Sequence, residues 1–123
     1  MSPPTAPFTL FVYGTLMRGG RNHHALIGQR FLGLARTRPL YALFDLGPYP
    51  GLVRDSTGRA VDGELYEVEV RLLSVLDAIE ESPSLFRLAP VEIEGCTEPA
   101  YTYFYQRKTD GAMLCPGRWI EER

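Results

Sequence analysis

Apolar residues come in short runs along the chain, and the spacing within each run predicts the secondary structure. The run from Phe8 to Tyr13 is almost continuous, which is typical of a strand buried on both faces. Other runs predict strands over residues 31–37, 41–45, 52–54, 60–70, 87–94 and 100–108. Turn residues at 55–58 favour a hairpin between 52–54 and 60–70, and the alternation of the second strand slips near Tyr66, which indicates a bulge or a bend.

The clearest helical period lies in residues 71–81, and Pro83 is expected to end that helix. A shorter helix is predicted over residues 22–27, with Asn22 as its N-cap. The order of elements is strand, helix, several strands, helix and two strands, which fits neither an alternating doubly wound fold nor an all-β sandwich. We therefore expect an α/β protein in which a mixed sheet curls into a small barrel, with two helices packed outside.

Composition and charge fit one domain over residues 1–123, with one core and a proline-rich polar tail at 1–7. The net charge is −2 and the arginines are scattered, so no basic stripe is available for nucleic acid. Apolar runs are all far shorter than the ~20 residues that span a membrane. Cys96 and Cys115 have no metal or redox spacing. We expect two free thiols in a reducing cytoplasm, and a disulfide between them is the alternative.

The strand at Phe8 runs into a glycine turn at Tyr13-Gly14-Thr15-Leu16, with a second glycine pair at 19–20. These glycines match neither the phosphate loop with its lysine nor the dinucleotide turn G-x-G-x-x-G. A turn of this kind leaves backbone N–H groups without strand partners, and such groups can hold a carboxylate or a carbonyl oxygen. Gly14 would let a ligand approach the backbone closely. The alternative is an ordinary turn between a strand and a helix.

One carboxylate of the 71–81 helix lies on its apolar face. In steps of 100° per residue, Glu80 falls between Leu73 and Leu76, whereas Glu81 falls on the opposite, polar side. The apolar arc consists of Leu72, Leu73, Leu76, Val75 and Ile79. Burial raises the pKa of a carboxyl group toward neutrality, where it can act as a general base or acid. The alternatives are a salt bridge from Glu80 to an arginine, or a frayed last turn that exposes it.

Other polar residues give weaker signals. His23 and His24 are adjacent, and adjacent side chains on a helix point about 100° apart, so we expect no metal site there. Tyr103 shares one strand face with its alternating tyrosine neighbours, either in a pocket or in packing. Arg87 could pair with a substrate carboxylate or with Glu80. For Glu64, a solvent-facing or paired charge is expected.

Five segments in order resemble the γ-glutamylcyclotransferase-like family, which includes the γ-glutamylamine cyclotransferases. These segments are Tyr13-Gly14-Thr15-Leu16, then 18–23, then Tyr49-Pro50-Gly51-Leu52-Val53, then Val61-Asp62-Gly63-Glu64-Leu65-Tyr66, and Leu76-Asp77-Ala78-Ile79-Glu80. Together they extend over most of the chain. The resemblance implies the family's small barrel flanked by helices.

The resemblance also implies a reaction. A γ-glutamyl group closes to 5-oxoproline and releases a free amine, with no cofactor and no metal. Glu80 would be the catalytic acid and base. The substrate-binding residues would be Tyr13, Gly14, Thr15, Leu16, Arg87 and Tyr103. The expected partner is this small substrate alone, with no nucleic acid and no membrane, and the protein would be a monomer or a small homo-oligomer. The resemblance leaves the identity of the amine open.

Two positions differ from the family pattern. Glu81 stands where the family usually has glycine, and Phe86 stands where a tyrosine usually precedes the arginine. Glu81 adds a second negative charge beside Glu80, and Phe86 lacks a hydroxyl group. These differences suggest a second hypothesis, in which the protein binds a small acidic ligand on the same fold and has lost catalysis.

Overall fold

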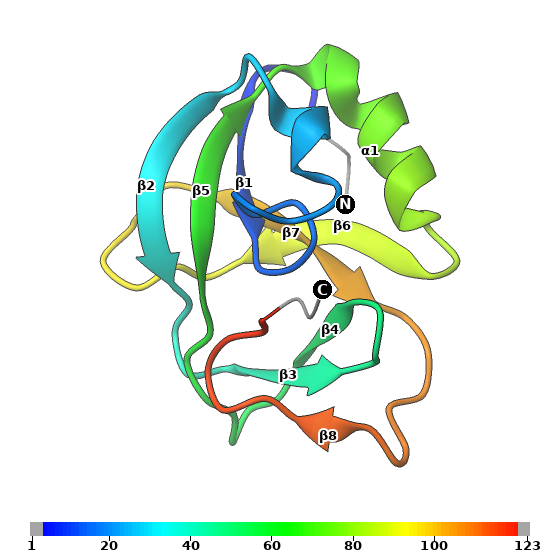
Figure 1. The fold of residues 1–123 in the computed structure, drawn as a ribbon. Helices are drawn as coiled ribbons and strands as arrows, with labels where there is room; N and C mark the ends of the chain where they lie inside the picture. The colour runs from blue at the N-terminus through cyan, green and yellow to red at the C-terminus, as the bar shows by residue number, and fades with distance from the viewer. Residues whose placement is uncertain (1–3, 121–123) are drawn as a thin grey trace.

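Strand β1 (Phe8–Val12) lies inside the larger of two β-sheets in the computed structural model, which describes residues 4–120. The larger sheet has the order β2-β5-β1-β7-β6, and the smaller has the order β4-β3-β8 (Figure 1). The strands are β2 (Arg30–Arg36), β3 (Tyr41–Asp45), β4 (Pro50–Arg54), β5 (Asp62–Val68), β6 (Phe86–Val91), β7 (Ala100–Tyr105) and β8 (Met113–Leu114). β1 pairs antiparallel with β5 and parallel with β7, so the sheet is mixed.

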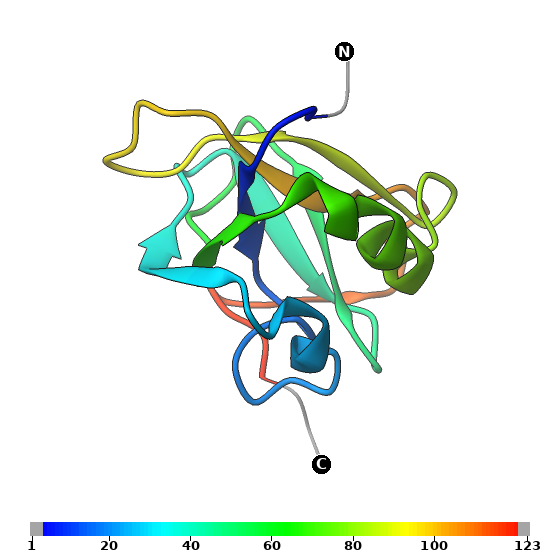
Figure 2. The same ribbon diagram turned by 90° about the horizontal axis from the view of Figure 1, so that it is seen from above.

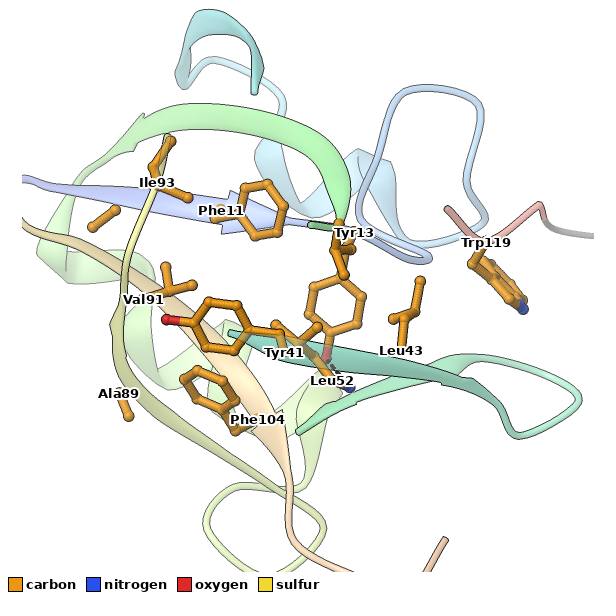
Figure 3. Close-up of a cluster of buried hydrophobic side chains, with 12 residues drawn as sticks. Phe11, Tyr13, Tyr41, Leu43, Leu52, Ala89, Val91, Ile93, Phe104 and Trp119 are labelled. Carbon is orange, nitrogen blue, oxygen red and sulfur yellow. Dashed lines mark hydrogen bonds between the residues drawn. The ribbon is translucent and has the colours of Figure 1, made fainter. Parts of the chain in front are cut away.

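Alternate residues of β1 enter two separate hydrophobic clusters, because successive side chains of a strand point to opposite faces. Phe11 belongs to the cluster between the two sheets, which Figure 3 shows together with Trp119. Leu10 and Val12 belong to the cluster on the other face. The near-continuous apolar run is thereby confirmed as a strand buried on both faces. The expectation of one core is wrong, since the sheet has a cluster on each side.

The second cluster is covered by the helical segments, η1 (His23–Leu26), η2 (Val70–Leu72) and α1 (Leu73–Glu80). Leu26 of η1 and Leu76 of α1 are almost fully buried in it. In the view from above, η1 and α1 lie toward the viewer over the larger sheet (Figure 2). Among residues 4–120, no helix is both long and apolar enough to cross a membrane.

The mixed α/β class is confirmed, but the expected barrel is not closed, since the strands form two sheets instead of one curled sheet. The expected hairpin is also wrong. β5 pairs with β1 and β2 rather than with β4, and Arg59 alone bridges back to Tyr41. This pairing buries Tyr66 and Val68 under the helices. The irregularity near Tyr66 is a register shift in the facing strand β2, between Phe31 and Gly33.

Several predicted boundaries shift. The helix predicted over 71–81 is divided into η2 and α1, and the one over 22–27 is a 3₁₀ turn of four residues. Asn22 makes no side-chain cap; its side-chain amide binds Thr15 instead. The strand predicted over 87–94 is β6, which begins at Phe86 and ends at Val91. The last long strand ends at Tyr105, and the short β8 had no signal in the sequence pattern.

Candidate active site

A pocket lies where the loop after β1 meets the C-terminal end of α1. It brings together six of the seven residues that the sequence singled out. Its lining consists of Phe11, Val12, Tyr13, Gly14, Thr15, Leu16, Tyr49, Pro50, Glu80, Phe86, Thr102 and Tyr103. The residue left out is Arg87. The pocket therefore joins the two features that stood out in the sequence, the glycine turn and the carboxylate on an apolar helix face.

Glu80 is the last residue of α1 and the only lining residue with a carboxyl group. Burial raises its pKa from 4.5 to about 7. No salt bridge of Glu80 is recorded within residues 4–120, which removes the ion-pair explanation for its place on the apolar face. Glu81, the next residue, is exposed. A carboxyl group with a pKa near neutrality can both take up and give back a proton at physiological pH.

Two tyrosines beside Glu80 have fixed hydroxyl groups. The Tyr13 hydroxyl donates to the carbonyl oxygen of Tyr103 at 2.6 Å and accepts from the N–H of Leu52 at 3.3 Å. The Tyr103 hydroxyl donates to Oδ1 of Asp77 at 2.7 Å. Burial raises the pKa of both tyrosines, and the negative charge of Glu80 raises it further. Both phenols therefore stay protonated, and Glu80 is the lining group that can exchange a proton near pH 7.

The loop from Tyr13 to Leu16 is closed by its own hydrogen bonds. The N–H of Met17 donates to the carbonyl of Gly14, and Asn22 binds Thr15 through both its main-chain N–H and its side-chain amide. Within residues 4–120, the N–H groups of Gly14, Thr15 and Leu16 donate no backbone hydrogen bond of a turn or loop. They are therefore available as donors, as the sequence predicted.

Gly14 also has a packing role that the sequence did not indicate. A Cβ atom at this position would lie 2.8 Å from Cδ of Pro50, which is too close. The missing side chain therefore allows the loop to pack against Pro50. Pro50 opens strand β4, so this contact fixes the loop against the smaller sheet.

Comparison with known proteins shows the family of the chain. Residues 10–121 match the family described as "Gamma-glutamyl cyclotransferase, AIG2-like". The chain belongs to this family. A relative in Vibrio cholerae is 43% identical over 113 residues, which cover 91% of this chain and 95% of that protein. The human gamma-glutamylaminecyclotransferase is 36% identical over 127 residues, which cover 91% of this chain and 83% of the human protein. The crystal structure of an AIG2-like protein from Mus musculus, 28% identical, superposes with a TM-score of 0.72 over 80% of this chain and 77% of that one.

The two departures from the pattern of the γ-glutamyl cyclotransferase family have clear places in the structure. Phe86 is buried in the pocket wall, where its ring packs edge-on against Tyr49 with centroids 5.7 Å apart. Arg87 is the next residue of β6 and is exposed, because neighbouring side chains of a strand alternate between its faces. Glu81 caps α1 in the left-handed conformation, with a φ of 51°. Glycine adopts this conformation without strain, which gives a physical reason for the family's usual glycine.

The structure gives no support to a metal at the histidine pair. Nδ1 of His23 lies 2.9 Å from the carbonyl oxygen of Leu16, and because that oxygen can only accept, Nδ1 carries the proton. Within residues 4–120, no group of three His, Cys, Asp or Glu side chains is placed to hold a metal ion. Cys96 and Cys115 are free thiols rather than a disulfide.

Two residues near the site were not predicted to take part. Asp77 was named only as part of a family-like segment, and its carboxylate accepts the Tyr103 hydroxyl. Tyr49 lines the pocket from the segment before β4. Tyr49 could have been found from the sequence, because it lies in one of the family-like segments. Nothing in the sequence indicated that Asp77 would bind Tyr103.

Proposed function

We propose that this γ-glutamyl cyclotransferase family member converts a γ-glutamyl group into 5-oxoproline and releases a free amine. The observation that carries the proposal is the partly buried carboxyl group of Glu80, whose pKa is about 7, in a pocket with the N–H donors of the Tyr13–Leu16 loop. The family supports it, and the human relative is named for this activity on γ-glutamylamines.

The reaction is an intramolecular transfer of an acyl group. The α-amine of the γ-glutamyl group attacks its own γ-carbonyl carbon, a C–N bond forms, and the original C–N bond to the amine breaks. Glu80 as carboxylate removes the proton that makes the α-amine an ammonium ion, and as carboxylic acid it then protonates the leaving amine. The new ring nitrogen gives up a second proton after the attack, and the released amine takes it up as an ammonium ion. The nucleophile belongs to the substrate, so the proposed chemistry calls for no cofactor.

The loop would bind the oxygen that becomes negative during the attack. The N–H groups of Gly14, Thr15 and Leu16 are fixed dipoles, and such donors stabilise a developing oxyanion without reorganising. Tyr13 and Tyr103 keep their hydroxyl protons and hold the pocket wall in place. Arg87 has no role in this proposal, because it lies outside the pocket.

A panel of γ-glutamyl compounds tests the proposal, with 5-oxoproline release as the measurement. It would include γ-glutamyl dipeptides, γ-glutamyl alkylamines and the γ-glutamyl-ε-lysine isopeptide. Release of 5-oxoproline together with an equal amount of amine from at least one compound is the expected result. Saturable binding of several compounds without release of 5-oxoproline would contradict the proposal. It would favour the binding protein that has lost catalysis.

A further inference from the structure

The N–H groups of the Tyr13–Leu16 loop can act as donors only if the loop is held in one conformation. The hydrogen bonds within the loop close it on itself, but they do not fix it to the sheet. Besides the contact of Gly14 with Pro50, a side chain of the larger sheet makes that connection. Glu64 lies in β5 on the face that carries the helices, and it is 7% exposed.

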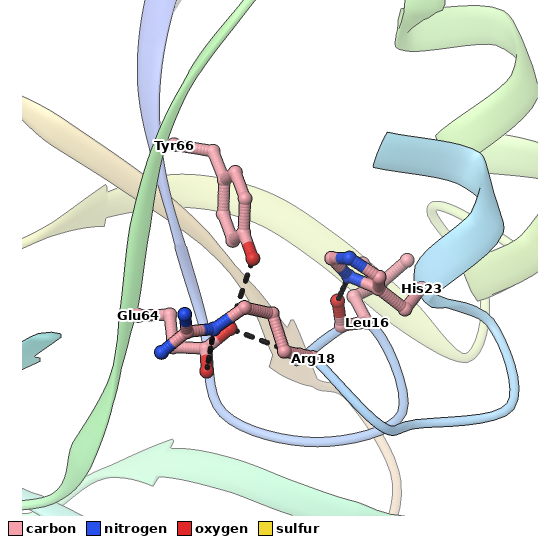
Figure 4. A network of polar contacts seen from close by, with 5 residues as sticks. All are labelled: Leu16, Arg18, His23, Glu64 and Tyr66. Atoms are coloured by element: carbon pink, nitrogen blue, oxygen red, sulfur yellow. Dashed lines mark hydrogen bonds and ion pairs between the residues drawn. The ribbon is translucent and has the colours of Figure 1, made fainter. Parts of the chain in front are cut away.

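The contacts of Glu64 reach the main chain at Arg18, two residues after the loop (Figure 4). Its Oε1 accepts from the backbone N–H of Arg18 at 3.0 Å, and the same oxygen accepts from the Tyr66 hydroxyl at 3.0 Å. Its Oε2 is 3.4 Å from Nε of Arg18. The two shorter contacts of Glu64 are therefore with the main-chain N–H of Arg18 and with Tyr66, its neighbour in β5.

The ion pair alone does not account for this arrangement. The Arg18 side chain is 55% exposed, and its guanidinium carbon lies 4.2 Å from the centre of the Phe31 ring. Because the arginine end of the pair is exposed to solvent, the charge attraction contributes little to stability, whereas burying the Glu64 carboxylate is costly unless its oxygens accept good hydrogen bonds. The backbone N–H of Arg18 is the better-placed donor.

A second contact from the same region of β5 supports the other side of the loop. Tyr66 packs against the His23 ring, with centroids 6.0 Å apart. His23 in turn donates from Nδ1 to the carbonyl of Leu16 at 2.9 Å. Glu64 and Tyr66 thus hold the chain at Arg18 and, through His23, at Leu16. The donor groups of the loop lie immediately before these two points.

We propose that Glu64 is a positioning residue for the substrate loop. Its carboxylate fixes the main chain at Arg18, which sets the direction of the N–H groups at Gly14, Thr15 and Leu16. The inference rests on the proposed function for its catalytic consequence. The structural part, that Glu64 restrains the loop, stands on the hydrogen bonds alone.

Three variants separate the positioning role from the ion pair. Glu64→Gln keeps the size of the side chain but has one acceptor oxygen, and its amide N–H₂ would face the N–H groups of Arg18. Arg18→Ala removes the guanidinium and keeps the backbone N–H that Glu64 accepts. Asp62→Asn is the matched control, because Asp62 is also a carboxylate of β5, with 41% of its side chain exposed, and its ion pair is with Arg36 at 2.8 Å.

The first readout is kcat/KM on a γ-glutamyl substrate, measured well below the unfolding temperature of each variant. Misplacing a binding group by about 1 Å can cost about 100-fold in rate, so Glu64→Gln is expected to lose about 10- to 100-fold. Arg18→Ala is expected to lose at most about fivefold, as for an exposed ion pair. Asp62→Asn should match the unmodified protein. Equal losses in Glu64→Gln and Arg18→Ala, or no loss in Glu64→Gln, would overturn the inference.

The second readout is amide hydrogen exchange, which does not depend on turnover. In Glu64→Gln, exchange is expected to speed up at the hydrogen-bonded amides of Met17, Arg18 and Asn22, which close the loop and join it to Glu64, and to stay unchanged in β7. Faster exchange both around the loop and in β7 would mean that Glu64 only stabilises the fold, which overturns the inference. Unchanged exchange around the loop would overturn it as well. If the unmodified protein releases no 5-oxoproline, the proposed function fails, while this measurement still decides whether Glu64 restrains the loop.

Discussion

The hydroxyl group of Tyr103 donates a 2.7 Å hydrogen bond to Oδ1 of Asp77, and this bond ties helix α1 to strand β7 one turn before Glu80. Tyr103 lines the pocket, and its own carbonyl oxygen accepts the hydroxyl of Tyr13. The position of Glu80 relative to the loop therefore depends on a chain of two tyrosines and one aspartate. α1 has only eight residues, so its end relies on such tertiary contacts.

Removing this bond is expected to weaken the fold and loosen the end of α1. Hydrogen bonds to charged groups contribute about 1.5 to 3 kcal/mol, and the partial exposure of Asp77 places its bond at the lower end. Tyr103→Phe and Asp77→Asn should each lower the free energy of unfolding, measured with urea. The double variant should lose about 1 kcal/mol less than the sum of the two single losses. Additive losses would mean that the bond does not couple the two residues.

The sequence predicted the features that depend on local periodicity. The run from Phe8 to Tyr13 indicated burial on both faces, and β1 has it. The period of the 71–81 segment placed Glu80 on the apolar side and Glu81 opposite, which agrees with the exposure of Glu81 and the partial burial of Glu80. These predictions succeed because the direction of a side chain follows from the backbone geometry of its own element.

The features that depend on distant partners were not predictable in this way. β5 pairs with β1 and β2 instead of its sequence neighbour β4, because that register buries Tyr66 and Val68. Arg87 leaves the pocket because Phe86, one residue earlier on β6, occupies the pocket face. The partner of Asp77 is 26 residues away, and no local pattern points to it.

Replacing Glu81 with glycine is expected to stabilise the protein. Glu81 has a φ of 51°, and a left-handed conformation costs a residue with a Cβ atom about 1 to 2 kcal/mol. The greater freedom of glycine in the unfolded chain offsets about 0.5 to 1 kcal/mol of this gain. Glu81→Gly should therefore raise the free energy of unfolding by about 0.5 to 1 kcal/mol.

The control for this prediction lies in the same helix. Ala78 is exposed and helical, so Ala78→Gly should lower the free energy of unfolding by about 1 kcal/mol. In urea unfolding, Glu81→Gly is expected to raise the free energy of unfolding and Ala78→Gly to lower it. A loss of stability in Glu81→Gly would show that the left-handed cap is not strained.

Stability should fall as pH rises from 4.5 to about 7, and Glu80 should be the cause. Burial raises the pKa of Glu80 to about 7 in the folded protein, whereas an unfolded chain has the ordinary value of 4.5. Between these values the folded protein keeps a proton that the unfolded chain has lost. The stabilisation is therefore complete below pH 4.5 and is lost as pH rises through 7, by up to about 3 kcal/mol.

Glu80→Gln isolates this contribution, because glutamine does not titrate. The comparison is urea unfolding of both proteins at several pH values between 5 and 8. Relative to the variant, the unmodified protein should lose stability steadily across this range. Glu80→Gln should be at least as stable as the unmodified protein at pH 8, where the buried carboxylate is charged. Parallel pH profiles for the two proteins would mean that the pKa of Glu80 is not raised by folding.

The central claim is tested most directly by comparing 5-oxoproline release by Glu80→Gln and Glu81→Gln on one accepted γ-glutamyl substrate. Glutamine keeps the size of the side chain but cannot transfer the proton, and loss of a general base or acid lowers the rate by about 10² to 10⁴. We expect Glu80→Gln to turn over substrate at least about 10²-fold more slowly, with substrate affinity and folding retained. Glu81→Gln should keep most of its activity, because Glu81 is exposed on the polar side of the helix. Equal turnover in Glu80→Gln and the unmodified protein would contradict the assignment of Glu80 as the acid and base.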